Sequence, residues 1–145
     1  MYIITEIYVL HIYRMLLYMP IFSRWYDEQQ SLILTQYDNG WTWQQRLNHD
    51  VHIITPMINA GMRPIALMED LRRSHWIPTP DFQQLVKETI TAGTAFPIDV
   101  VVFISKEPSI NALLVAAHQH HGADSRIYLS ASTVEQACQL IQENR

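Results

Sequence analysis

Residues 98–104 read Ile-Asp-Val-Val-Val-Phe-Ile, a short, β-branched apolar run that is the strongest strand signal in the chain. A run of this kind is typical of a central strand that is buried on both faces of a sheet. Residues 62–71 predict a second buried strand, with Pro64 near its start. Helical spacing in residues 80–93 and 108–121 then predicts one helix between these two strands and another after them.

The residues on the N-terminal side predict a β-hairpin, with strands at 22–26 and 31–37. A helix should follow the hairpin, because Thr42 and Gln45 have the spacing of a capping box. The buried face of this helix is expected to comprise five apolar residues at helical steps: Trp43, Leu47, Val51, Ile54 and Ile58.

Residue types at the helix ends supply the other boundaries. Pro56 should kink or weaken the first helix, and Gly61 should end it at the C′ position. Thr79 is expected to be the N-cap of the second helix, with a proline in its first turn. A last strand at 126–129 precedes the run Ser132-Thr133-Val134-Glu135, a capping box that should open the final helix.

The predicted order is strand, strand, helix, followed by three further strand–helix pairs. This alternation predicts an α/β fold: a mixed sheet with an N-terminal hairpin and parallel later strands, joined by right-handed crossovers and packed by about four helices. A chain of 145 residues, of which 48% are hydrophobic and 17% charged, is long enough for one such domain with its own core.

The charge balance and the cysteine content argue against several classes of function. Ten Lys and Arg residues against 14 Asp and Glu residues give a net charge of −4, and no basic run is present, so nucleic-acid binding is not expected. The single cysteine, Cys138, excludes an intramolecular disulfide and a multi-cysteine zinc site. It also fits a reducing compartment, and we therefore expect a cytoplasmic protein.

Residues 1–20 are the most apolar stretch of the chain. A membrane span needs about 20 largely uncharged residues, and Glu6, His11 and Arg14 interrupt this stretch. A signal peptide is not expected, because the charge does not come first and a small-residue cleavage site is missing. We interpret residues 1–20 as an apolar extension, an extra packed element or a membrane contact, and residues 21–145 as a single domain.

Three segments share a further pattern. The predicted hairpin leads into Trp41-Thr42-Trp43, Asp70-Leu71 closes a buried strand before a short loop, and the last strand leads into Ser-Ala-Ser-Thr-Val-Glu-Gln-Ala at 130–137. In this order the segments resemble STAS domains, the fold of the anti-sigma-factor antagonists and their SEC14-like relatives. The resemblance covers about residues 21–143.

The resemblance implies a non-enzymatic regulatory module without a cofactor, which acts on a protein partner or as a homo-oligomer. Counting forward from Asp70 without a gap puts Thr79 where the antagonists carry their phosphorylated serine, so the resemblance also implies a phospho-switch at Thr79. The chain departs from the family pattern at Pro78, which replaces an aspartate.

The predicted loop after the second buried strand holds the candidate partner-binding residues Arg72, Arg73, His75 and Trp76. Arg and Trp are the types that dominate binding hot spots, and open α/β sheets bind ligands at the carboxyl ends of their strands. The alternative is a solvated loop whose Trp76 packs on the next helix. A phosphate on Thr79 would meet the free N–H groups of a helix start, and the alternative there is a simple N-cap.

Neither a catalytic site nor a metal site is expected from the sequence motifs. Histidines recur three residues apart in two helices, without an acidic residue at a signature spacing: His49 with His52, and His118 with His121. The second group is expected to complement the C-terminal end of its helix. Glu69 and Asp70 are adjacent in a strand and should point to opposite faces of the sheet, and Cys138 is expected to be a small core residue.

Two hypotheses from different functional classes follow. The first is the non-enzymatic interaction module. The second is a small apolar-ligand or lipid-binding protein of the SEC14-like kind, with a pocket between the sheet and a helix. Trp41, Trp43, Trp76 and the methionines are the candidate lining residues of that pocket. A histidine-dependent metalloenzyme is a third, weaker alternative.

Overall fold

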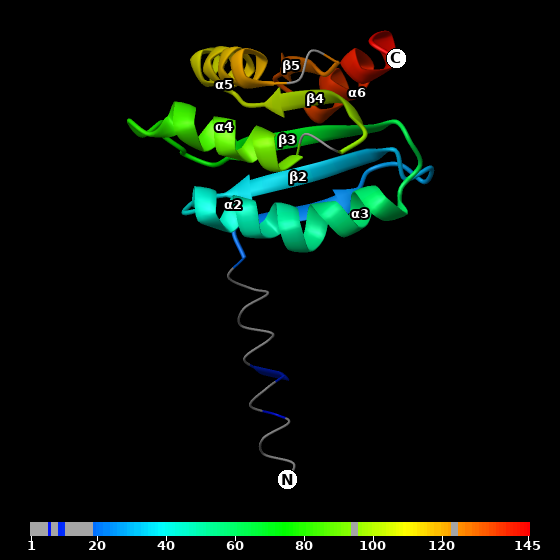
Figure 1. Ribbon diagram of the computed structural model, residues 1–145, viewed down its shortest axis with the longest axis horizontal. Coiled ribbons are helices and arrows are strands. Elements are labelled where there is room, and N and C mark those ends of the chain that lie inside the picture. Colours follow the sequence, from blue (N-terminus) through cyan, green and yellow to red (C-terminus); the bar gives the residue numbers. More distant parts are fainter. Residues whose placement is uncertain (1–5, 7–8, 11–18, 94–95, 123–124) are drawn as a thin grey trace.

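The computed structural model describes residues 6, 9–10, 19–93, 96–122 and 125–145. One sheet runs through the domain, and its strands lie in sequence order: β1 (Ile21–Trp25), β2 (Leu32–Asp38), β3 (Ile65–Arg73), β4 (Ile98–Ile104) and β5 (Ile127–Ala131). β1 is antiparallel to β2, and the later neighbours pair in parallel (Figure 1). The predicted α/β fold with an N-terminal hairpin is confirmed.

The helical segments follow the predicted order: α2 (Trp43–His49), η1 (Asp50–Ile54), α3 (Thr55–Ala60), α4 (Phe82–Gly93), α5 (Pro108–His121) and α6 (Val134–Glu143). Parallel strands that are added in order through right-handed crossovers put every connecting helix on the same side. The segments α2 to α5 therefore cover one face of the sheet, and among the described helices α6 alone packs on the other.

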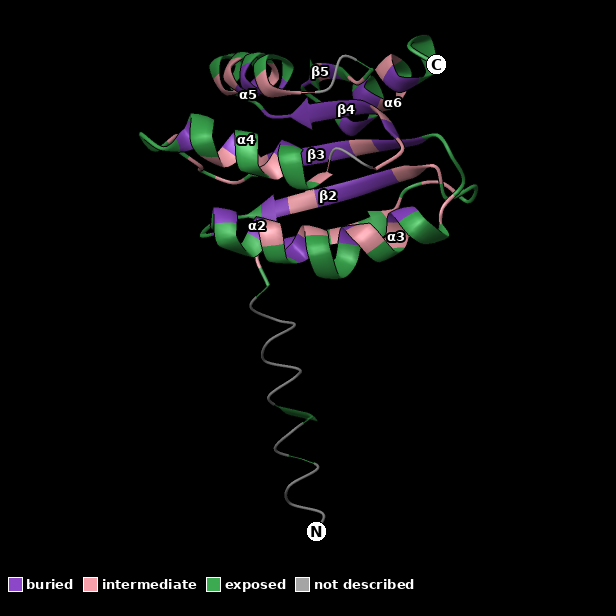
Figure 2. Cartoon of the chain, viewed as in Figure 1, coloured by how far each residue is buried: buried purple, intermediate pink, exposed green. Residues whose placement is uncertain are grey.

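Two separate cores result from this arrangement. On β3, Ile65 and Leu67 face α2 to α5, whereas Ala66 and Met68 face α6. The central strands are buried over most of their length, as Figure 2 shows for β3 and β4. No helix in the described part of the chain has the length and apolar character needed to cross a membrane. Most of residues 1–20 lie outside the described residues, so their interpretation stays a prediction.

The first helix continues past Pro56 instead of breaking there. In an α-helix the Pro56 N–H would bond the His52 carbonyl, and proline has no N–H. The chain responds with a π-helical turn, η1, in which the Thr55 N–H bonds the Asp50 carbonyl and the Thr55 hydroxyl donates to the same oxygen at 2.8 Å. The turn rotates the helix, and the prediction that Val51 is buried is wrong, because 60% of it is exposed.

The helix ends confirm some predicted caps and correct others. Thr42 forms the predicted capping box with Gln45. Gly61 ends α3 with a φ of −82°, so it is not a left-handed C′ residue. A glycine is needed there because a Cβ atom would lie 2.5 Å from the Trp25 ring. The N-cap of α6 is Thr133 and not Ser132: the Thr133 side chain accepts from the Gln136 N–H, and the Gln136 side chain accepts from the Ser132 N–H, one residue before the cap.

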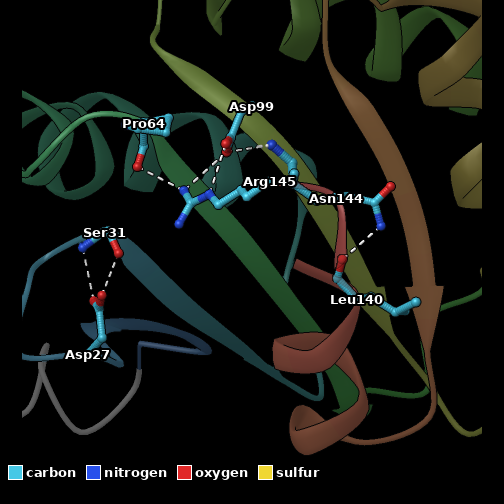
Figure 3. A network of polar contacts seen from close by, with 8 residues as sticks. Asp27, Ser31, Pro64, Asp99, Leu140, Asn144 and Arg145 are labelled. Atoms are coloured by element: carbon cyan, nitrogen blue, oxygen red, sulfur yellow. Dashed lines mark hydrogen bonds and ion pairs between the residues drawn. The ribbon is translucent and has the colours of Figure 1, made fainter. Parts of the chain in front are cut away.

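Polar contacts fasten the end of the sheet opposite the carboxyl ends of the parallel strands. The Arg145 guanidinium donates to the Asp99 carboxylate at 2.9 Å and to the Pro64 carbonyl at 2.8 Å (Figure 3). Nearby, the Asp27 carboxylate accepts the Ser31 backbone N–H at 2.9 Å and so closes the β1–β2 turn. These contacts tie the C-terminus and the hairpin to the sheet.

Candidate functional site

A cavity of about 130 Å³ lies between the sheet and the helices η1 and α4. Its wall is mostly apolar and draws on the first helix, α4 and the strands β3 and β4: Leu47, Val51, Ile54, Leu67, Ile90, Ala92, Phe96, Ile98 and Val101. Val51 and Ala92 are exposed, so the cavity reaches the surface between η1 and the end of α4. The position beneath a helical layer agrees with the predicted pocket between the sheet and a helix.

Charged and polar side chains form the inner wall of this cavity. Arg46 and Glu69 line it although only 8% and 6% of them are exposed. The Tyr37 hydroxyl donates to the Glu69 carboxylate at 2.7 Å. Asp50 and His118 complete the group from η1 and α5. Buried charges are rare unless they are paired, so this group is the main departure from an ordinary core.

Arg46 is the least satisfied member of the group. Its Cζ lies 4.7 Å from the centre of the Trp43 ring. Its Nε is buried without a hydrogen-bond partner, and no described residue accepts a hydrogen bond from the guanidinium. Burial would lower the pKa of Arg46, but the surrounding acidic groups Tyr37, Glu69 and Asp50 outweigh burial and raise it. The cavity therefore holds a permanent positive charge with unused donors.

Asp50 and His118 both favour their neutral forms. Burial raises the pKa of Asp50 to about 7, with Arg46 opposing and Glu69 reinforcing the shift. Burial lowers the pKa of His118 to about 3, and the Arg46 charge adds to this effect. His118 is also held in place, because its Nδ1 lies 2.7 Å from the Leu114 carbonyl oxygen. At neutral pH His118 is uncharged, which corrects the expectation that it complements the end of α5.

Sequence reasoning missed this site. Arg46 and His49 occupy the buried side of α2 with Trp43, where only the apolar residues of the helix were expected. The adjacent carboxyls Glu69 and Asp70 do point to opposite faces, as predicted, and this directs Glu69 to the cavity. The signal was a charged residue inside the apolar run Ile-Ala-Leu-Met-Glu-Asp-Leu at 65–71.

The candidate partner-binding residues lie at the carboxyl end of β3. Arg72 and Arg73 are its last residues and not part of a loop. Arg72 makes a bidentate ion pair with Asp70, with both nitrogen–oxygen distances 2.9 Å. Arg73 is exposed and lies 3.7 Å from the Asp38 carboxylate. The four candidates Arg72, Arg73, His75 and Trp76 thus lie close together in the sequence, and the exposed Thr79 follows shortly after them.

From Arg73 onward, exposed side chains alternate with half-buried ones. Arg73, His75, Ile77 and Thr79 are exposed, and 78% of Ile77 is accessible. The Thr79 hydroxyl donates to the Asp81 carboxylate and does not cap α4, whose regular part begins at Phe82. The predicted N-cap role of the Thr79 side chain is therefore wrong, and its phosphorylation stays a prediction.

The tryptophans do not line the cavity. Trp41 and Trp76 stack with their ring centres 5.9 Å apart, and Trp76 packs on Phe82 of α4 at 5.2 Å. Trp43 joins the same cluster, and Trp41 donates to the Ser74 hydroxyl at 2.7 Å. This aromatic cluster holds the segment after β3 against the first helix and α4, next to the polar wall of the cavity.

The histidines are distributed among structural roles. His49 is buried and lies 2.7 Å from the Ser23 hydroxyl, whereas its helix neighbour His52 is exposed. His121 lies 3.1 Å from the Gln83 side chain. The described residues contain no group of three or more His, Cys, Asp or Glu side chains that could hold a metal ion. The chain matches no family model, no curated protein and no solved structure.

Proposed function

We propose that this chain is a binding protein for a compact, mostly apolar molecule, which it takes up in the cavity between η1, α4 and the sheet. The observation that carries the proposal is the combination of a mostly apolar cavity of about 130 Å³ with buried charged groups in its wall. Small-molecule sites are typically concave and apolar, with a few polar groups that orient the ligand.

An empty packing defect is a poorer account of the same cavity. Protein interiors are close-packed, and voids larger than a water molecule are few. A defect would also be expected among apolar side chains, whereas this cavity is bordered by Arg46, Asp50 and Glu69. Keeping such groups buried costs folding free energy, and a binding role explains why the site has them.

The proposed role is ligand binding without catalysis. We place it in the cytoplasm, because a single cysteine fits a reducing compartment. It corresponds to the ligand-binding alternative that the SEC14-like side of the resemblance implied. The exposed Val51 and the half-buried Leu47 lie on the first helix at the open side, where small movements of that helix against α4 would admit the ligand.

Calorimetric titration with the neutral probes phenol and benzyl alcohol tests the proposal. Wild-type protein is expected to bind at least one of them at millimolar concentration. Val51→Trp, which places a large ring at the open side, should weaken that binding about tenfold or more. His52→Trp is the matched control, because His52 is exposed, adjacent and not part of the lining. Equal affinities of these two variants, or no binding of either probe, would contradict the proposal.

A protein-interaction role is the second candidate, and the exposed segment from Arg73 to Thr79 favours it. Ile77 presents a large apolar side chain to solvent between His75 and Thr79, and such exposure is typical of contact surfaces. The STAS resemblance suggests a protein partner or a second copy of the chain, with Thr79 as a switch. Thr79→Glu should then change the affinity for partners recovered by pull-down. If the partners and their affinities stay unchanged, a switch at Thr79 is contradicted.

A further inference from the structure

We infer that the molecule bound in this cavity is a compact monocarboxylate, and that the Arg46 guanidinium receives its carboxylate group. This inference rests on the proposed binding function and names the chemical class of the ligand. It follows from three features of the cavity. The buried Arg46 guanidinium has unused donors, the Glu69 carboxylate is hydrogen-bonded to Tyr37 and not to Arg46, and apolar side chains enclose the rest of the volume.

The first feature is the state of Arg46. A guanidinium has five N–H donors in a planar fork that matches the two oxygens of a carboxylate. Arg46 is 92% buried, lines the cavity and donates to no described residue. Leaving charged donors buried and unbonded is unfavourable, and charge-assisted bidentate hydrogen bonds to a carboxylate remove that cost.

The second feature is that the acidic groups nearby do not occupy Arg46. Glu69 accepts the Tyr37 hydroxyl at 2.7 Å, and the described ion pairs include neither Glu69 nor Asp50 with Arg46. Asp50 holds its proton for about half of the time at neutral pH, because burial raises its pKa to about 7. A protonated Asp50 offers a hydrogen-bond donor on the same helix as Arg46, four residues further on.

The third feature is the size of the cavity. A dry engineered cavity of about 150 Å³ is known to hold benzene, and the cavity here has about 130 Å³. Apolar side chains such as Leu67, Ile90 and Val101 form much of the remaining wall. A single ring or a short branched chain therefore fits, with one carboxylate at the polar end, whereas a long lipid chain does not.

Binding of a carboxylate should be coupled to protonation of Asp50. The other titratable or charged groups that surround the cavity belong to five different parts of the chain: Tyr37, Arg46, Glu69, His118, Arg126 and Tyr128. Among them, His118 stays neutral well above its pKa of about 3. An ionised Asp50 repels a second carboxylate, so the affinity should fall as the pH rises through about 7.

Calorimetry with four probes of one ring each tests the inference on the full chain: benzoate, benzamide, benzyl alcohol and benzylamine. Benzoate is expected to bind most tightly at pH 6 and to lose about tenfold in affinity at pH 8, since a group with a pKa of about 7 loses most of its proton over this range. Asp50→Asn should bind benzoate at pH 8 as tightly as the wild type does at pH 6.

Arg46→Gln should weaken benzoate about tenfold or more and should change benzyl alcohol much less. If that variant fails to fold, Arg46→Lys replaces it, because lysine keeps the charge but lacks the planar fork. His52→Gln is the matched control on the same helix and should leave the affinity for benzoate unchanged.

The outcomes separate the two proposals. Tighter binding of benzylamine than of benzoate, or an unchanged affinity for benzoate in both Arg46 variants, would overturn the carboxylate assignment. Binding of benzyl alcohol without benzoate would overturn it too, while the proposed binding function would stand. If none of the four probes binds at millimolar concentration, both proposals fail.

Discussion

The two faces of the sheet are built differently although they share the same strands. The face under α6 packs mainly aliphatic residues such as Met68, Val102 and Ile141, and the buried Asp70 on this face is paired with Arg72. The face under α2 to α5 encloses Tyr37 and Glu69, the Arg46 guanidinium, which donates to no described residue, and a cavity. The buried charge of the first face is thus paired within the fold, whereas the second face combines a cavity with a buried cation that has unused donors.

Connectivity explains why the site lies on the crowded face. Three crossovers deliver their helices to that side: the first helix after β2, α4 after β3 and α5 after β4. The segment η1 lies over the first part of the sheet and α4 over the middle, and the cavity is lined from both. Within the described residues α6 meets no second helix on its own side, so no gap between two described helices arises there.

The two faces should differ most in the unfolding free energy that is lost when a core side chain is truncated to alanine. Ile141→Ala on α6 removes a fully buried side chain from the core under this helix and should lower the free energy of unfolding by about 3 kcal/mol. Leu67→Ala, beside the cavity, should cost less than Ile141→Ala, because Leu67 already borders empty space. Chemical denaturation measures both, and an equal or larger cost at Leu67 would contradict the proposed asymmetry.

Removing a hydrogen bond from the cavity face should have the next largest effect. Tyr37→Phe leaves the buried Glu69 carboxylate without its hydroxyl donor and should cost about 1–3 kcal/mol. Tyr26→Phe serves as the control, because Tyr26 follows β1 and is 37% exposed, and its change should stay within about 0.5 kcal/mol. Similar costs for both substitutions, measured by denaturation, would mean that the buried hydrogen bond contributes little.

The pH dependence of stability should also distinguish the faces. The pKa of Asp50 is about 7 in the fold and near 4 in the unfolded chain, so the folded state binds the extra proton between these values. This contribution to stability is present at low pH and is lost as the pH rises through about 7. Asp50→Asn should therefore gain stability relative to wild type from pH 5 to pH 8, as thermal unfolding would show. A constant difference across this range would contradict the assigned pKa.

The smallest effect is expected at the helix caps. Thr42→Ala and Thr133→Ala each remove a side-chain acceptor at the start of a helix and should cost about 1 kcal/mol. Only Thr42→Ala should also weaken ligand binding, because α2 carries Arg46. Calorimetry with benzoate would reveal this split, and equal binding losses in the two variants would argue against a site on the first face.

Local sequence patterns were enough for the layer structure but not for the site. The strand at 98–104 and the helix at 108–121 have the predicted bounds, because their signals are local. Val51 was misplaced, since a helical wheel assumes an unbroken α-helical register and Pro56 imposes a π-turn. The burial of Arg46 was not predicted, because the wheel selects only apolar residues for the buried face. The approach of Glu69 to Tyr37 depends on the pairing of β2 with β3, which no single segment encodes.

Mapping by NMR tests the central claim most directly, because it asks which face of the sheet takes up a ligand. Titration with benzoate at pH 6 should shift the resonances of Leu47, Ile90 and Val101, which line the cavity, and leave those of Val134 and Ile141 under α6 in place. Shifts that center on α6, or a diffuse pattern without saturation, would contradict a binding site on the helix-rich face.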